Sequence, residues 1–285
     1  MNNTLATHKE KQPVSDTRVT LRQDLPAAQA RLYGVMGLVG LMVLWFIITT
    51  FRWVSPGTLP PIPRVIKGFF QLFTEEDLLH HMGVSIFLNA SGYLEAILVS
   101  LPLGFLIGLN KRVRAVMMQW FTALRFLPLA PVLCLFIAWF HMGYNMKIQF
   151  LAFGIIVYLV PQIVARIQEL DPIYEDTIIT TGGKNWHAIR YVYMPATLAQ
   201  VLPDIRVLVA ISWTYITLAE ALNENQGGLG ALTNAVRYSD NGMGKVYAIL
   251  GIIMFIGFMQ DFLFAILDRA LFPYKRLMAK KQGGK

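Results

Sequence analysis

The sequence has 285 residues, of which 55% are hydrophobic and 15% charged, and its mean hydropathy is +0.49. A chain of this length with so few charges is too apolar for a water-soluble protein, so we expect an integral membrane protein. The net charge of +8 would favour nucleic-acid binding only in a soluble protein. The single cysteine, Cys134, excludes an intrachain disulfide.

Six apolar stretches follow a polar start. Residues 1–31 contain few large apolar groups, and we expect them to form a cytoplasmic N-terminal arm. Each later stretch can cross roughly 30 Å of hydrocarbon at about 20 residues per helix. The stretches are Tyr33 to Phe51, residues 82–109, Phe126 to Met146, Ile148 to Ala165, residues 202–222, and Val246 to Asp268. The sequence therefore predicts an all-α, polytopic membrane protein with six transmembrane helices in residues 32–272 and a basic cytoplasmic tail in residues 273–285.

A surface helix is expected between the first two spans. In residues 64–73 the large apolar side chains fall on one helical face, and Arg64, Lys67 and Gln71 fall on the other. This pattern predicts an amphipathic helix on the outer membrane surface. Thr74 and Asp77 have the spacing of a capping box, which predicts that the next helix begins there.

The basic residues are distributed unequally between the two sides of the membrane. Seventeen Lys and Arg lie in the segments on the same side as the N-terminus, and six, including Lys147, lie in the opposite segments. The positive-inside rule therefore places both termini and residues 171–195 in the cytoplasm. The basic excess sets the topology, so nucleic acid is not an expected partner.

The polar stretch at residues 171–195 lies between two apolar spans. Asp171, Pro172 and the acidic residues Glu175 and Asp176 are typical of a helix start. The pair Gly182-Gly183 predicts the end of that helix or a sharp turn. We expect a second segment to follow and to stop at Pro195. A stretch this polar must lie in water, where a soluble partner can bind it.

This stretch resembles the cytoplasmic coupling loop of ABC importer permeases. The family pattern reads Glu-Ala-Ala, three residues, Gly, nine residues, then Ile-x-Leu-Pro. Here Gly182 lies thirteen positions before Pro195, and Asp176 with Thr177-Ile178 stands at the place of Glu-Ala-Ala. Glu175 is an alternative for the acidic position.

The resemblance covers residues 55–272 and narrows to the branch that serves nitrate, bicarbonate, taurine and aliphatic sulfonates. In this branch His141 stands where glycine is usual. The other matching groups are His81-Met82, Pro102-Leu103-Gly104, Arg125 with Pro128, Trp139-Phe140, Leu202 to Val207, Ala219-Glu220, and Gly228-Leu229-Gly230.

The resemblance implies a type I importer permease in the cell inner membrane. Two copies, as a homodimer, would enclose the pathway, cytoplasmic ATPase subunits would bind the coupling loops, and an extracytoplasmic binding protein would deliver the solute. The residues implied in ATPase coupling are Glu175, Asp176, Thr177, Gly182, Gly183 and Pro195. No phosphate-binding glycine loop occurs, so ATP hydrolysis is expected in another chain, and no cofactor or metal is expected.

Three charged residues are candidates for the translocation pathway, because a charge inside the bilayer costs roughly 2.5–3.5 kcal/mol. We expect the third helix to begin about ten residues before Arg125, which would place this side chain roughly 15 Å along it and near the midplane. Arg206 is either a pathway residue or a side chain that extends to the inner surface. Glu220 is either a polar helix end or an outer gate.

The predicted function is ATP-driven import of a small anionic solute. Import of a different small nutrient, such as a vitamin precursor, is an alternative, and a secondary transporter without an ATPase is a further one. An intramembrane enzyme is disfavoured because no motif links a serine such as Ser85 or Ser212 to a histidine.

Overall fold

The computed structural model describes residues 25–222 and 224–273, and regular structure within them is entirely helical. The predicted arm, up to residue 24, and the basic tail, from residue 274, lie outside the described residues. The helices are α1 (Ala27–Thr50), α2 (Ile62–Glu75), α3 (Leu78–Leu109), α4 (Lys111–Leu124), α5 (Leu129–Phe140), α6 (Tyr144–Gln168), α7 (Ile173–Thr180), α8 (Asn185–Ala188), the π-helix η1 (Ile189–Tyr193), α9 (Met194–Glu220), the 3-10 helix η2 (Glu224–Gln226), α10 (Leu229–Val236) and α11 (Gly242–Leu271).

Five helical runs are long and apolar enough to cross a membrane: α1, α3, α6, the run from α8 through α9, and α11. The pair α4 and α5 makes a sixth if its two parts are one span. The predicted count of six is confirmed in that sense. Two of the predicted spans begin later than the helices that contain them. The span predicted from Tyr33 lies in α1, which starts at Ala27, and the span predicted from residue 202 lies in α9, which starts at Met194.

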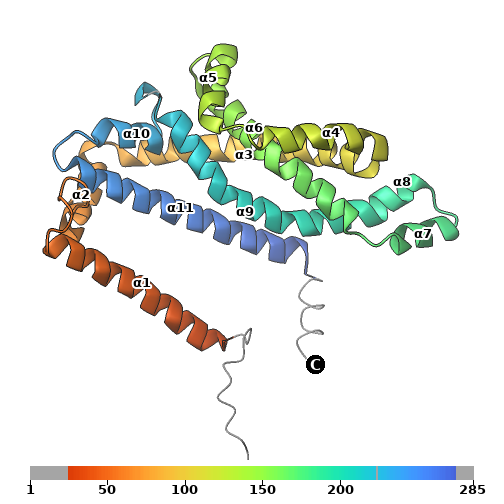
Figure 1. The fold of residues 1–285 in the computed structure, drawn as a ribbon, viewed down its shortest axis with the longest axis horizontal. Helices are drawn as coiled ribbons and strands as arrows, with labels where there is room; N and C mark the ends of the chain where they lie inside the picture. Colours follow the sequence, from red (N-terminus) through yellow and green to blue (C-terminus); the bar gives the residue numbers. More distant parts are fainter. Residues whose placement is uncertain (1–24, 223, 274–285) are drawn as a thin grey trace, which may run out of the picture.

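The core lies where α6 packs between α3 and α9 (Figure 1). Close approach of α3 to α6 depends on the small residues that the sequence places in α3. A Cβ atom on Gly104 would lie 2.6 Å from Cγ2 of Ile163, and one on Gly108 would lie 2.6 Å from Cδ1 of Ile167. The two helices therefore meet at a distance that only glycine permits on the α3 side.

The third predicted span is not one straight helix. α4 ends at Leu124 and α5 begins at Leu129, with a bend of 104° between them. Pro128 is the N-cap residue of α5 with an extended backbone, and a proline restricts the residue before it to extended conformations. Arg125 is therefore the exposed C-cap residue of α4, at this bend rather than in the middle of one straight span.

The amphipathic helix predicted at residues 64–73 is confirmed as α2, which packs against the start of α11 through buried Gly68 and Leu72. The predicted capping box is wrong. Thr74 lies inside α2, where its hydroxyl donates to the carbonyl of Phe70, and Asp77 precedes α3 with a left-handed backbone and no capping bond.

The predicted stop at Pro195 is also wrong. The chain is helical without interruption from Asn185 to Glu220. Pro195 lies in the first turn of α9, directly after the π-helix η1. A proline cannot donate to the ladder, and the wider turn of a π-helix before it accommodates the missing donor.

α1 stands away from the bundle in Figure 1, and its apolar side chains are exposed. Its attachment within the described residues is near its C-terminal end. Trp45 donates its indole N–H to the carbonyl of Pro60 at 3.1 Å, and its ring lies 5.7 Å from that of Tyr247. The helix is therefore free along its length to contact lipid or another subunit.

Candidate functional site

The segment that contains α7 lies at one end of the bundle, opposite α2 and α10 (Figure 1). Its start follows the predicted signals. Pro172 is the N-cap residue, and Oδ1 of Asp171 accepts a hydrogen bond from the amide of Ile173 at 3.0 Å. Glu175 and Asp176 lie in the first turn, where the positive end of the helix dipole stabilises their negative charges. The local signals for this helix start are confirmed.

α7 ends in a Schellman motif formed by the glycine pair. The amide of Gly183 donates to the carbonyl of Ile178 at 2.9 Å, and the amide of Gly182 donates to that of Ile179 at 3.0 Å. Gly182 has a φ of +84°, which favours glycine. A Cβ atom on Gly183 would lie 2.6 Å from Cγ2 of Ile178. Both glycines are therefore required by the turn itself.

The structure separates the two candidates for the acidic position. Oε2 of Glu175 accepts a hydrogen bond from the hydroxyl of Tyr193 at 2.5 Å, which ties α7 to η1. Asp176 and Thr177 are exposed. Glu175 therefore holds α7 to the bundle, whereas Asp176 faces water.

The surface around α7 and α8 exposes six large apolar side chains to water. Their exposed fractions lie between 41% and 63%. A hollow of about 720 Å³ between Tyr174 and Pro195 adds to this surface. Contiguous exposed apolar groups are typical of a protein-interaction site. The six are Ile173, Tyr174, Ile179, Trp186, Tyr191 and Met194.

An ion pair links the helices on either side of α7. The guanidinium of Arg166 in α6 makes two bonds of 2.8 Å to the carboxylate of Asp204 in α9 and one of 2.8 Å to Glu169. A two-point pair of this kind fixes orientation as well as distance. A displacement of α7 would therefore move α6 and α9 together.

The pathway candidates Arg125 and Arg206 lie in different surroundings. Arg206 is exposed and pairs with Asp261 of α11, with one bond of 2.6 Å between Nη2 and Oδ2. The guanidinium of Arg125 lies 5.7 Å from the ring centre of Tyr158 at the α4–α5 bend. The structure does not bring them together, and their role in transport stays a prediction.

Glu220 is completely buried at the C-terminal end of α9. Its Oε1 accepts from the hydroxyl of Ser85 in α3 at 2.7 Å, and its Oε2 accepts from the amide of Gly230 in α10 at 2.9 Å. The Ser85 hydroxyl also accepts from the amide of Leu229 at 2.7 Å. A Cβ atom on Gly228 would lie 2.6 Å from Oε1. Glu220 therefore joins three elements at the end of the bundle opposite α7.

Lys147, which was expected in an outer segment, is the fourth residue of α6 and is completely buried. Its ammonium has no hydrogen-bond partner within the described residues, and Glu220 is the acidic group that acts on it electrostatically. The position of Lys147 next to an apolar run was the only sequence signal for its burial. Its relation to Glu220 on α9 was not evident from the sequence. In the described part of the chain, no cluster of His, Cys, Asp and Glu could hold a metal ion.

Comparisons with known proteins agree with this architecture. Residues 100–273 match the family model described as "Binding-protein-dependent transport system inner membrane component". An aliphatic sulfonates transport permease protein, SsuC of Bacillus subtilis, is 27% identical over 82% of this chain and 84% of its own length. The taurine transport system permease protein TauC of Escherichia coli is 22% identical over 83% of this chain and 87% of its own length. The formylaminopyrimidine transport permease protein ThiX of Halalkalibacterium halodurans is 22% identical over 90% and 99%.

Solved structures show the same fold. A chain of the MetNI methionine ABC transporter matches with a TM-score of 0.61 and 15% identity over 68% of this chain and 95% of its own. A chain of an amino acid ABC transporter matches with a TM-score of 0.56 and 18% identity over 73% of this chain and 97% of its own. The chain therefore belongs to the family of inner-membrane components of binding-protein-dependent transport systems and has the fold of ABC importer permeases.

Proposed function

We propose that this chain is the translocation subunit of an ATP-driven importer and that α7 is the element on which a cytoplasmic ATPase acts. The observation that carries the proposal is the presentation of α7. A short helix with a fixed Schellman turn and an apolar, exposed surface stands at one end of the bundle. ATP hydrolysis takes place in the partner chain.

The orientation of the chain in the membrane follows from the distribution of its basic residues. Lys111, Arg112 and Arg114 lie at the α7 end of the bundle, as do Arg166 and Lys184. The positive-inside rule places the α7 end in the cytoplasm, with both termini on that side.

Coupling then takes place by rigid-body motion. Closure of an ATPase dimer displaces two α7 helices, one from each of two copies of this chain. The Glu175–Tyr193 hydrogen bond and the Arg166–Asp204 ion pair pass the displacement to α6 and α9. The equilibrium between inward-open and outward-open states shifts because the ATPase contacts α7 differently in the two states.

A small anion of the sulfonate type is the proposed solute. Support comes from relatives named as sulfonate and taurine permeases, which match more than four-fifths of this chain. The alternative is another small nutrient, favoured by the formylaminopyrimidine permease that matches 90% of it. Binding of taurine, an alkanesulfonate and a pyrimidine to the cognate binding protein distinguishes the two.

Purification in mild detergent, followed by mass spectrometry of the co-purifying chains, tests the proposal. We expect a complex with ATPase subunits whose ATP hydrolysis rises when the loaded binding protein is added. A stable carrier that transports solute with no ATPase present would contradict the proposal and favour a secondary transporter.

A further inference from the structure

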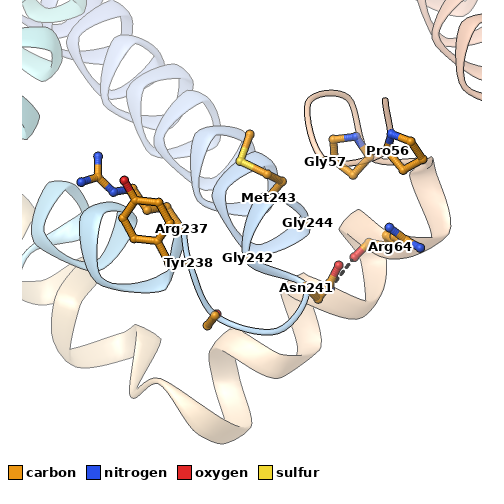
Figure 2. Close-up of a pocket in the computed structure, with 11 residues that line it drawn as sticks. Pro56, Gly57, Arg64, Arg237, Tyr238, Asn241, Gly242, Met243 and Gly244 are labelled. Atoms are coloured by element: carbon orange, nitrogen blue, oxygen red, sulfur yellow. Dashed lines mark hydrogen bonds between the residues drawn. The ribbon is translucent and has the colours of Figure 1, made fainter. Parts of the chain in front are cut away.

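A basic hollow of about 330 Å³ opens where α2, α10 and α11 meet, at the end of the bundle opposite α7. Figure 2 shows Arg64 of α2 on one side of it and Arg237 with Tyr238, which follow α10, on the other. Asn241 and the first turn of α11 form its base. Two arginines and no acidic residue line it, and Asp240 lies between two of the lining residues in the sequence.

Both arginines are available to a partner. Within residues 25–222 and 224–273, neither forms an ion pair. The nearby carboxylates of Glu75 and Glu76 are already held by the Lys245 ammonium at 3.1 and 2.6 Å. The two arginines outnumber the exposed carboxylate of Asp240 beside the hollow, so the charge of its lining favours an acidic ligand.

Tyr238 gives the rim an aromatic anchor. It is 84% exposed, and the guanidinium of Arg237 lies 4.5 Å from the centre of its ring. Tyrosine and arginine are the residue types most often found at the energetic centre of protein interfaces. Their exposure side by side indicates a macromolecular partner.

The hollow is formed before any partner binds. The Asn241 side chain donates to the carbonyl of Arg64 at 3.0 Å and to Oε1 of Gln71 at 3.1 Å, as Figure 2 shows for the first of these bonds. A Cβ atom on Gly244 would lie 2.7 Å from the same Arg64 carbonyl oxygen. α2 and α11 are therefore held in fixed contact, which lowers the ordering cost of binding.

We propose that this hollow, with Arg64, Arg237 and Tyr238 around it, receives an acidic surface of the soluble binding protein on which the family depends. The proposal rests on the proposed function, which makes this end the outer one. A lipid phosphate is the competing ligand. The face of α2 that suits lipid carries Phe70, which is 63% exposed, whereas Arg64 belongs to the polar face of the same helix.

The test begins with identification of the partner. p-Benzoylphenylalanine in place of Tyr238 is photoactivated in whole cells, and the cross-linked species is identified by mass spectrometry. The binding protein recovered in this way is purified and used as the probe. Its Kd for the complete transporter in lipid nanodiscs is then measured against salt concentration.

The charge-reversal variant Arg64→Glu/Arg237→Glu is expected to raise this Kd at least about tenfold and to flatten its salt dependence. Lys67→Glu, the same change one turn along α2 and outside the hollow, is the matched control and is expected to change Kd less than about twofold. Equal Kd values for the natural protein and the double variant, or cross-links to phospholipid alone, would overturn the docking site.

Two further measurements separate this failure from failure of the proposed function. In a Cys134→Ser background, Tyr238→Cys should react with a membrane-impermeant thiol reagent added outside intact cells. ATPase subunits should also co-purify with the double variant. If both hold and Kd is unchanged, only the docking site is wrong. If Tyr238→Cys reacts from the cytoplasm instead, both proposals fail.

Discussion

Replacement of Glu220 tests whether this carboxylate stabilises the end of the bundle opposite α7. Glu220→Ala removes two hydrogen bonds, one from Ser85 at 2.7 Å and one from Gly230 at 2.9 Å. Each leaves a buried donor without its acceptor, which costs about 1–3 kcal/mol, so we expect a loss of about 2–6 kcal/mol. At about 2–4 °C per kcal/mol, the melting temperature should fall by about 4–24 °C.

Glu220→Gln should cost about half as much. Its oxygen can still accept from Gly230, but its amide group must then face Ser85, whose hydroxyl already accepts from Leu229. The hydroxyl proton of Ser85 loses its partner, so about 1–3 kcal/mol is lost. Glu95→Gln in α3 is the control, because Glu95 is only partly buried and bonds to Gln149 at 3.0 Å.

The assays are thermal unfolding in detergent, followed by tryptophan fluorescence, and hydrogen exchange at the Leu229 and Gly230 amides. Faster exchange at these two amides in Glu220→Ala, with α7 unaffected, would locate the effect at the end of the bundle opposite α7. If Glu220→Ala melted at the same temperature as the natural protein, the carboxylate would not stabilise this end.

Three other predictions concern separate parts of the chain. Gly182→Val should reduce ATPase stimulation in the reconstituted complex, while Gly182→Asn should retain more of it, because a left-handed backbone costs most residues about 1–2 kcal/mol and asparagine less. Equal activity of the two variants would contradict this. Arg166→Met and Asp204→Leu should each lower the melting temperature, and the double variant should recover part of the loss, because Arg166→Met leaves the partly buried Asp204 without its cation and Asp204→Leu leaves Arg166 with Glu169 alone. Strictly additive effects would argue against the pair. The Lys245 hydrogen bond holds the pKa of Glu75 below its ordinary value, so Glu75 stabilises the fold while ionised; the difference in melting temperature between the natural protein and Glu75→Gln should shrink as pH falls below about 4. A difference that grew with acidification would refute that assignment.

The sequence predicted the features that depend on local chemistry. Apolar length located the spans, and proline, acidic and glycine signals located both ends of α7. His141 adopts a φ of +59° at the end of α5, a conformation that favours glycine. This explains why the resembling family has glycine at this position. These signals act within a few residues of one another, so the sequence carries them directly.

Features that depend on packing were not predicted. Pro128 breaks the helix locally, but the size of the bend, 104°, also depends on how α5 packs against α6, where the rings of Phe136 and Phe150 lie 5.7 Å apart. Pro195 did not end its helix because the π-turn before it absorbs the missing donor. The burial of Lys147 and its relation to Glu220 join residues on different helices. No periodicity within one segment carries that information.

The central claim is that α7 lies in the cytoplasm against an ATPase, and thiol labelling of Tyr174→Cys in a Cys134→Ser background tests it most directly. Tyr174 is 57% exposed, so the substituted thiol is accessible. The account predicts no reaction with a membrane-impermeant reagent outside intact cells, rapid reaction in inside-out vesicles stripped of ATPase, and protection when the ATPase is added back. Labelling from outside, or equal labelling with and without the ATPase, would contradict it.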